Sequence, residues 1–209
     1  MIAMILAAGR GERMRPLTDT IPKPLLLVRG KALIEWHIEN LVSYGFKTIV
    51  INIAHLGEQI IKTLGDGKKW DIKIIYSDER ESGALETAGA IIKSLEFLSE
   101  EFLVVNGDIW CDYNFDSHFK LHNSLAHLIL VPNPEHNIKG DFLYKKSYYT
   151  FSGIGYYSKK IFENMPLEKC ALAPILKELD AQKKISFELH NGIWNDIGIP
   201  ERLEQVNAL

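Results

Sequence analysis

Short runs of apolar residues alternate with longer stretches of helical periodicity along the first 131 residues of the chain. The runs are rich in β-branched residues, which is typical of buried strands, and they cover residues 2–6, 48–53, 72–76, 102–105 and 126–131. The intervening stretches place apolar side chains on one face of a helix, and they cover residues 32–43, 56–64 and 86–98. Strands and helices that alternate in this way predict right-handed βαβ connections and a parallel sheet.

The pattern changes after Val131. A hairpin is expected from residues 141–144 and 148–151, around Lys145, Lys146 and Ser147. Further strands are expected at 153–157 and 185–189, and helices at 172–179 and from Pro200 onward. The whole pattern predicts an α/β fold class: a Rossmann-like, mostly parallel sheet flanked by helices, with a small antiparallel addition, in one domain of residues 1–209.

Composition narrows the class of protein only slightly. Hydrophobic residues make up 46% of the chain and charged residues 24%, as in ordinary globular proteins, and the formal net charge is −3. This charge gives no reason to expect nucleic acid or an anionic membrane as a partner. Cys111 and Cys170 lack CxxC spacing, so neither a zinc site nor a disulfide framework is expected. No apolar stretch reaches the ~18 residues of a membrane span, and we expect a cytoplasmic protein.

Two glycines, Gly9 and Gly11, directly follow the first predicted strand. They allow a sharp turn and leave backbone N–H groups unobstructed, which is the geometry that an anion needs. The next residues contain four basic side chains against two acidic ones, the basic residues being Arg10, Arg13, Arg15 and Lys23. A local excess of positive charge on a glycine turn predicts a polyphosphate ligand. The plainer alternative is a tight turn with solvated arginines, because a Gly-x-Gly match alone is weak.

Two better-known phosphate-binding loops do not fit this segment. A dinucleotide-binding fingerprint needs a third glycine where this chain has Met14. A Walker-type loop needs Gly-Lys-Ser or Gly-Lys-Thr, and the sequence contains neither. A nicotinamide-dependent oxidoreductase is therefore disfavoured.

Two aspartates are candidate metal ligands. Asp108 follows an apolar strand in Asn106-Gly107-Asp108, and Asp196 lies in Trp194-Asn195-Asp196-Ile197-Gly198. Carboxylates suit Mg²⁺, which usually takes one or two of them and completes its shell with substrate phosphates and waters. Taken singly, each aspartate is more often a turn former or a helix cap. Because the carboxyl ends of parallel strands meet at one rim of a sheet, we expect Gly9 and Asp108 to lie close together.

A long signature of fixed spacing begins at Leu6 and reads LAAGRGERMRPLT, followed by PKPL at residues 22–25. It resembles the signature of the sugar-1-phosphate nucleotidyltransferases. The resemblance implies transfer of a nucleotidyl group from a nucleoside triphosphate to a sugar 1-phosphate, with release of pyrophosphate. It also implies Mg²⁺ on Asp108 and Asp196, a nucleotide half of residues 1 to about 110, and a sugar half of residues 111–209.

The reaction brings two polyanions together, so fixed cations are needed more than an acid or a base. We expect Arg15 to act on the leaving phosphates and Lys23 on the phosphates of the reacting pair, while solvated surface positions remain the alternative for Arg10 and Arg13. The nucleotide-binding residues expected from the resemblance are Leu6, Ala8, Gly9, Gly11, Glu12, Arg13, Asn52, Thr87 and Gly89. The sugar-binding residues expected are Asn106, Asp141, Ser152 and Gly153.

Several short segments are most similar to one branch of the family, which transfers a uridylyl group from UTP to N-acetylmuramate 1-phosphate in peptidoglycan recycling. They are LETAG at residues 85–89, VNGD at 105–108, KGDF at 139–142 and FSGI at 151–154. Guanylyl- and thymidylyltransferase relatives share the loop and both aspartates and stay as alternatives. Glu86 replaces a glycine common in the mannose 1-phosphate branch, which favours UTP over GTP. The segment Phe142–Thr150 is shorter than in relatives, which leaves the sugar open.

A non-enzyme alternative is a catalytically silent nucleotide-binding regulator. Such a protein should have lost one of the residues on which the chemistry depends. All four are present: Arg15, Lys23, Asp108 and Asp196. The sequence ends soon after the last predicted helix and has no β-helix extension of the kind that relatives use for assembly, so we expect a monomer.

Overall fold

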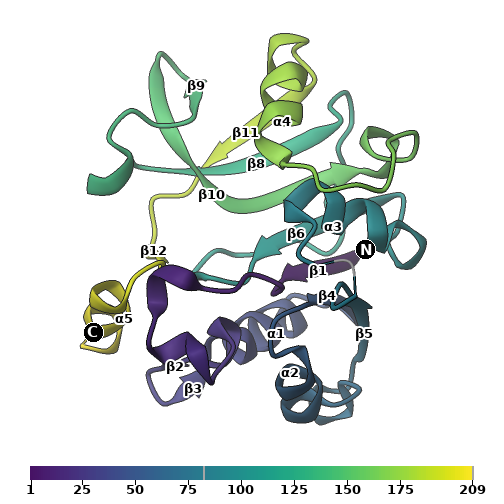
Figure 1. Cartoon of the computed structure of the whole chain (residues 1–209). Helices are drawn as coiled ribbons and strands as arrows, with labels where there is room; N and C mark the ends of the chain where they lie inside the picture. Colours follow the sequence, from purple (N-terminus) through teal and green to yellow (C-terminus); the bar gives the residue numbers. More distant parts are fainter. Residues whose placement is uncertain (82, 209) are drawn as a thin grey trace.

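A mixed sheet forms the centre of the computed structural model, which describes residues 1–81 and 83–208 (Figure 1). Over these residues the spatial order of the strands is β11-β8-β10-β6-β1-β4-β5, with β9 paired to β10. Their bounds are β1 (Ile2–Leu6), β4 (Thr48–Ile53), β5 (Lys73–Asp78), β6 (Glu101–Asn106), β8 (Ala126–Val131), β9 (Phe142–Tyr144), β10 (Ser147–Ser158) and β11 (Ile185–Leu189).

Strand β1 occupies the middle of the parallel part of this sheet. It runs parallel to β4 on one side and to β6 on the other, and β5 runs parallel to β4. The last residue of β1, Leu6, lies opposite Asn52 of β4 and Asn106 of β6. The register therefore brings three chain segments, far apart in sequence, to the same rim of the sheet.

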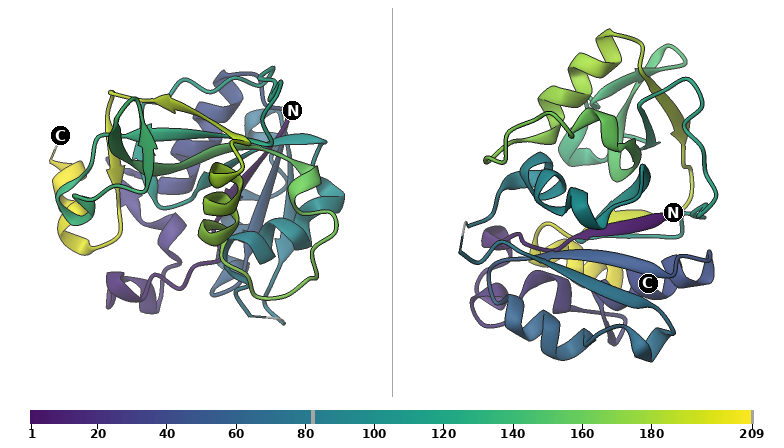
Figure 2. Two further views of the ribbon diagram at one scale, coloured as in Figure 1. Left: turned by 90° about the horizontal axis from the view of Figure 1, so that it is seen from above. Right: turned by 90° about the vertical axis from the view of Figure 1, so that its right-hand side faces the viewer.

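Helices cover both faces of the sheet (Figure 2). On one face α1 (Leu33–Ser43) and α2 (Gly57–Leu64) pack Ile38 and Ile60 against β1 residues such as Ile5. On the other face α3 (Glu86–Ser94) and α4 (Leu172–Ala181) pack Ile91 and Leu176 in a cluster with Met4. Because successive residues of a strand point to opposite faces, the apolar run of β1 is buried on both sides.

The last part of the chain returns to the first loop. Strand β12 (Trp194–Asp196) pairs antiparallel with β7 (Ile109–Cys111), and α5 (Pro200–Asn207) follows it. Leu203 and Val206 of α5 share an apolar cluster with Met14 of the loop after β1. A further short pair, β2 (Leu27–Val28) with β3 (Lys31–Ala32), lies beside this cluster. Figure 1 shows this return, with the yellow segment of β12 and α5 beside the purple loop that follows β1.

The predicted α/β fold class is confirmed, and so is the hairpin, which is β9–β10 with Lys145 and Lys146 at its turn. One prediction was wrong: residues 148–151 and 153–157 are not two strands but parts of the single strand β10. The strand continues through Gly153 because its pairing with β8 shifts register there, and glycine accepts the positive φ of 84° that this bulge requires. In the described part of the chain, no helix is both long and apolar enough to cross a bilayer.

Candidate active site

The loop after β1 is held in a shape that only glycine permits at position 11. Gly11 has a φ of 63°, and a Cβ atom there would lie 2.9 Å from Thr18 Cγ2 and 3.2 Å from Lys23 Cβ. The Thr18 hydroxyl donates a hydrogen bond to the Gly11 carbonyl at 2.8 Å. These contacts fold the basic segment back on itself and bring Lys23 next to the glycine turn.

Lys23 and Asp108 form an ion pair at the rim of the sheet. The Lys23 ammonium group donates a hydrogen bond of 2.7 Å to Asp108 Oδ2. Lys23 is only 9% exposed, although lysine is among the residues least often buried. Asp108 comes two residues after the end of β6, so the carboxyl end of a buried strand positions the acid.

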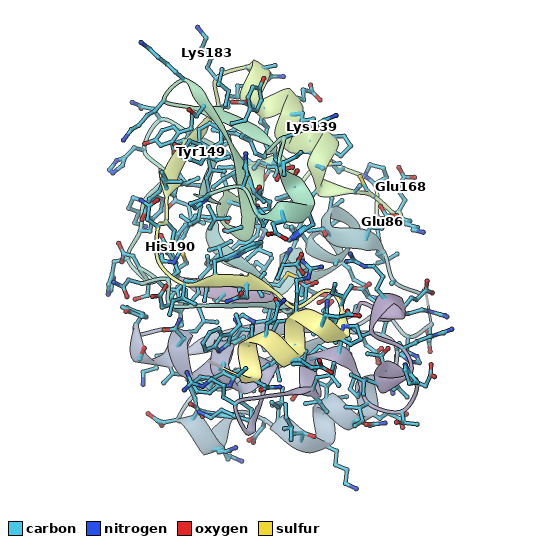
Figure 3. All side chains as sticks on the ribbon, turned by 90° about the vertical axis from the view of Figure 1, so that its left-hand side faces the viewer. Glu86, Lys139, Tyr149, Glu168, Lys183 and His190 are labelled. Atoms are coloured by element: carbon cyan, nitrogen blue, oxygen red, sulfur yellow. The ribbon has the colours of Figure 1, made fainter. Side chains whose placement is uncertain are left out.

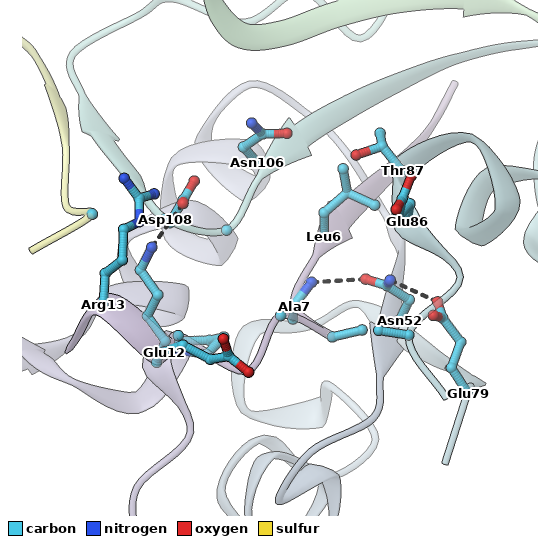
Figure 4. Close-up of a pocket in the computed structure, with 18 residues that line it drawn as sticks. Leu6, Ala7, Glu12, Arg13, Asn52, Glu79, Glu86, Thr87, Asn106 and Asp108 are labelled. Atoms are coloured by element: carbon cyan, nitrogen blue, oxygen red, sulfur yellow. Dashed lines mark hydrogen bonds and ion pairs between the residues drawn. The ribbon is translucent and has the colours of Figure 1, made fainter. Parts of the chain in front are cut away.

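A cavity of about 450 Å³ opens where β1, β4 and β6 end (Figure 4). The residues around it come from the first loop, the ends of these strands and the start of α3. The predicted site residues that line it are Leu6, Ala8, Gly9, Gly11, Glu12, Arg13, Lys23, Asn52, Thr87, Asn106 and Asp108. The glycine turn, Lys23 and one candidate metal ligand, Asp108, therefore meet at a single cavity, whose lining does not include Asp196.

Arg15 does not line this cavity, and its contact with the leaving phosphates stays a prediction. Its side chain is 61% exposed and its Nε lies 3.1 Å from Asp19 Oδ1. Arg13 lines the cavity instead. Met14, between the two arginines, is fully buried in the cluster with α5, so the neighbouring side chains leave the loop on different sides.

A buried histidine lies behind the Lys23–Asp108 pair. His37 of α1 is 4% exposed. Burial lowers its pKa from the ordinary 6.5 to about 4, and the nearby Asp108 carboxylate opposes this shift only in part. His37 is thus neutral at pH 7 and adds no positive charge to the pair.

The second candidate metal ligand, Asp196, lies beside Asp108 through backbone pairing. Asp196 is opposite Ile109 in the β12–β7 pair, and Ile197 N donates to the Asp108 carbonyl at 2.8 Å. The Asp196 Oδ2 atom lies 2.8 Å from Arg202 Nη1 and 3.2 Å from His136 Nε2. Its Oδ1 atom is buried and has no hydrogen-bond partner within residues 1–81 and 83–208.

Gly198 joins Asp196 to the cavity. A Cβ atom at Gly198 would lie 2.8 Å from Asp196 Oδ1 and 3.3 Å from Arg13 Nη2, and Gly198 itself lines the cavity. No group of three or more His, Cys, Asp and Glu side chains forms a ready metal site in the part of the chain that the structure describes. Two carboxylates, one of them with an unpartnered buried oxygen, suit Mg²⁺, which needs few protein ligands.

A second cavity of about 550 Å³ adjoins the first. Glu86, Thr87 and Asn106 line both cavities. The predicted sugar residues Asp141 and Gly153 also line the second one. Gly153 is required for close approach, because a Cβ atom there would lie 2.6 Å from Asn106 Nδ2.

Ser152 lies outside the linings of both cavities, and its sugar contact stays a prediction. It is 1% exposed, and its hydroxyl oxygen accepts a hydrogen bond from Ile154 N at 3.1 Å. Its carbonyl oxygen accepts from Trp194 Nε1 at 2.9 Å. Ser152 thus connects β10 to β12 and shapes the site from behind.

Gly89 is also absent from the lining of both cavities. Its N–H donates to the Cys170 carbonyl at 3.2 Å, and a Cβ atom there would lie 2.5 Å from the Glu168 carbonyl oxygen. A glycine is needed here because the segment before α4 crosses close over α3. Figure 3 shows Glu86 and Glu168 on the same flank of the molecule.

The amide of Asn52 is fully engaged by protein groups. Its Oδ1 accepts from Ala7 N at 2.7 Å, and its Nδ2 donates to Glu79 Oε1 at 2.7 Å. Glu79 Oε2 accepts in turn from Leu85 N at 2.9 Å. Figure 4 shows the contacts of Asn52 with Ala7 and with Glu79. Asn52 therefore fixes the first loop relative to the segment before α3.

Glu79 lines the first cavity but was not among the residues expected from the sequence. Glu86, noted above only for the choice of base, and Gly198, noted only as part of the Asp196 segment, line it as well. One signal could have found Glu79: it comes directly after β5, at the same carboxyl rim as Gly9 and Asp108. Glu86 begins α3 with a φ of 60°, which no pattern of apolar residues indicates.

The nucleotidyl transferase family model matches residues 2–142. The chain belongs to this family and is a nucleotidyltransferase. The fold and the cavity at the carboxyl rim of its sheet agree with this class.

The chain is similar to several proteins of known name. The chain is 47% identical to N-acetylmuramate alpha-1-phosphate uridylyltransferase of Neisseria meningitidis over all of its own length and 98% of that protein. It is 30% identical to the bifunctional protein GlmU of Methanocaldococcus jannaschii, covering 99% of this chain and 53% of that one. A solved structure described as a glucose-1-phosphate thymidylyltransferase of Bacillus anthracis superposes with a TM-score of 0.85 at 22% identity, over 100% of this chain and 94% of that chain, and shares the fold.

Proposed function

We propose that the enzyme transfers a uridylyl group from UTP to N-acetylmuramate 1-phosphate, releasing pyrophosphate, as a cytoplasmic monomer in cell-wall recycling. The observation that carries this proposal is the pair of adjoining cavities that share Thr87 and Asn106. One cavity has the phosphate-binding loop and the other has the predicted sugar residues. The similarity to the uridylyltransferase of Neisseria meningitidis over the full chain supports this choice of substrates.

The nucleotide half corresponds to residues 1 to about 110 and the sugar half to 111–209. All residues that line the first cavity lie in the first half except Gly198. The base rests against the backbone of Leu6 to Gly9 and against Thr87, at the floor that Asn52 and Glu79 hold in place. The triphosphate extends along the Gly9–Gly11 turn, whose N–H groups and nearby cations favour an anion.

Charge explains the arrangement of the remaining groups. Two unit negative charges about 4 Å apart repel by ~1 kcal/mol in water and by ~4 kcal/mol at an effective dielectric constant of 20. Arg13 and Lys23 supply fixed positive charge that offsets this repulsion as the sugar phosphate approaches the α-phosphorus. The attacking phosphate oxygen is already ionised at pH 7, so the reaction needs no general base.

Enzymes of this family generally use a divalent metal. Asp108 and Asp196 are the groups that would hold it here, and Mg²⁺ is our proposal for its identity. When bound, the metal ion neutralises phosphate oxygens and aligns the reacting groups. Lys23 holds the Asp108 carboxylate in place, and Arg202 and His136 do the same for Asp196.

The test is a grid of reactions in which pyrophosphate release is measured for UTP, GTP, CTP and dTTP with several sugar 1-phosphates. We expect the highest kcat/KM for UTP with N-acetylmuramate 1-phosphate and loss of turnover when EDTA is added. Faster turnover of GTP with mannose 1-phosphate, or of dTTP with glucose 1-phosphate, would reassign the substrates. Pyrophosphate release from none of the pairs would favour the regulatory alternative.

A further inference from the structure

The second cavity contains one basic side chain among the residues that line it. Its other lining residues are mostly apolar or small, such as Phe142, Phe151 and Leu176, and its charged lining residues are Glu86, Asp141 and Lys177. The balance of these three charges decides which substituents of a bound sugar are favoured.

The two acids of this cavity are already engaged by protein groups. Asp141 Oδ2 accepts from Phe151 N at 2.8 Å, and its Oδ1 accepts from Asn137 Nδ2 at 3.1 Å. Glu86 Oε1 lies 3.5 Å from Lys169 Nζ, so a lysine outside the cavity offsets its charge. Glu86 is thus paired with a cation, whereas Asp141 keeps its charge but has both carboxylate oxygens hydrogen-bonded to protein groups.

Lys177 differs from these acids because it has no carboxylate within 4.0 Å in the part of the chain that the structure describes. It belongs to α4, which is anchored by the buried side chains of Leu172, Leu176 and Leu179. The helix is thus a fixed support for a long, flexible cation at the cavity wall.

The direction of the bound sugar follows from the reaction. Its 1-phosphate must reach the α-phosphate of the nucleotide, so it lies at the border between the cavities, near Asn106. The sugar ring then extends away from that border into the second cavity. Besides Asn106, the lining of the second cavity includes residues 171–173 and 176–177 of the α4 segment.

We propose that Lys177 binds a carboxylate group on the acceptor sugar, which makes it a specificity residue for acidic hexosamine 1-phosphates. This inference rests on the proposed function and deepens it. N-acetylmuramate differs from N-acetylglucosamine by a lactyl ether that ends in a carboxylate. The ammonium group of Lys177 pairs with that carboxylate, while Phe142 and Phe151 offer apolar surface to its methyl group.

The experiment compares two acceptors that differ only in the lactyl group, N-acetylmuramate 1-phosphate and N-acetylglucosamine 1-phosphate, with UTP. In Lys177→Met, we expect kcat/KM for the first acceptor to fall about tenfold, the scale of one hydrogen bond to a charged group, mainly through KM. The value for the second acceptor should stay within about twofold of the wild type. Lys177→Arg should restore most of the preference, because it retains the charge.

Lys183→Met is the matched control, since it removes the same charge from an exposed position near the end of α4 that does not line the cavity. Its preference should equal that of the wild type. Turnover of N-acetylglucosamine 1-phosphate by each variant reports that the protein is folded. Raised salt should also weaken the wild-type preference and leave that of Lys177→Met unchanged.

Two further outcomes distinguish a failure of the role of Lys177 from a failure of the proposed function. If the wild type prefers N-acetylmuramate 1-phosphate and Lys177→Met keeps that preference, the role of Lys177 is overturned while the proposed function stands. If the wild type uses UTP with N-acetylglucosamine 1-phosphate but rejects the acidic acceptor, both the proposed acceptor and the role of Lys177 are overturned.

Discussion

Lys23 and Asp108 lie 85 positions apart in the chain, yet the ammonium nitrogen of one is 2.7 Å from a carboxylate oxygen of the other. The pair joins the basic loop after β1 to the acid after β6. The pair places a positive charge that attracts phosphate, on Lys23, beside a negative charge that attracts a cation, on Asp108.

Lys23→Ala should lower kcat by roughly 10²–10³, the usual loss for one oriented group that stabilises developing charge. The effect combines the loss of a cation near the phosphates with the loss of the group that holds Asp108. Steady-state pyrophosphate release measures it. Thermal unfolding of the same variant is the control, and a rate near that of the wild type would exclude Lys23 from the chemistry.

Replacing each of the two arginines on either side of Met14 should have very different effects on kcat/KM. Arg13→Ala should lower kcat/KM by roughly 10²–10³, because Arg13 lines the nucleotide cavity. Arg15→Ala should change it by no more than about twofold, because its exposed pair with Asp19 contributes little. Both variants remove the same charge from the same loop, so each is the control for the other. The reverse order of effects would return the catalytic assignment to Arg15.

Gly153→Ala should destabilise the protein and impair the site together. The substitution combines a positive φ of 84° with a Cβ atom 2.6 Å from Asn106 Nδ2, so the free energy of unfolding should fall by about 1–3 kcal/mol. Gly30→Ala is the control, since Gly30 has a φ of 80° but no atom within 4 Å of the added carbon. Urea unfolding should show a smaller loss for Gly30→Ala. Equal losses would mean that backbone strain alone, and not the contact with Asn106, determines the cost.

The free energy of unfolding should fall in mild acid because of the titration of His37. Its pKa is about 4 in the folded protein against 6.5 when unfolded, so the unfolded chain binds the extra proton first as pH falls. The contribution of His37 to stability is present above pH 6.5 and is lost between pH 6.5 and 4. The loss should approach a few kcal/mol, on the order of 1.4 kcal/mol for each pKa unit.

The measurement is the free energy of unfolding in urea at a series of pH values, with metal ions removed by EDTA. The free energies of unfolding of the wild type and of His37→Gln should converge or change order as the pH falls, because the variant lacks the titrating group. Parallel curves across this range would show that protonation of His37 does not limit acid stability.

The apolar runs predict most of the sheet, because a strand that is buried on both faces has a continuous run of apolar residues in its own sequence. The runs that became β1, β4, β6 and β8 needed no knowledge of their neighbours. β10 was divided wrongly at Gly153, because glycine indicates a break to any local rule while the neighbouring strands β6 and β8 keep the strand continuous. The three-residue strands β7 and β12 have too little sequence for a periodic signal.

Site residues were predictable where the end of a strand determined their position. They were less predictable where packing against distant parts of the chain determined the direction of the side chain. Gly9 and Asp108 follow from the rule that parallel strands end at a common rim, and both line the same cavity. The difference between Arg13 and Arg15 depends on Met14 contacting α5, nearly two hundred positions later in the chain. Gly89 and Ser152 match the family pattern but do not line either cavity, and their surroundings show close packing with the Glu168 carbonyl and a hydrogen bond to Trp194.

The cluster of Met14 with Leu203 and Val206 also bears on how the molecule matures during synthesis. A chain leaving the ribosome exposes its basic loop well before α5. Until that helix has emerged, Met14 lacks part of its apolar surroundings and Asp196 lacks the guanidinium of Arg202. A ribosome-bound chain that stops before residue 200 would thus hold the central strands but not the contacts that α5 makes with the first loop and with β12.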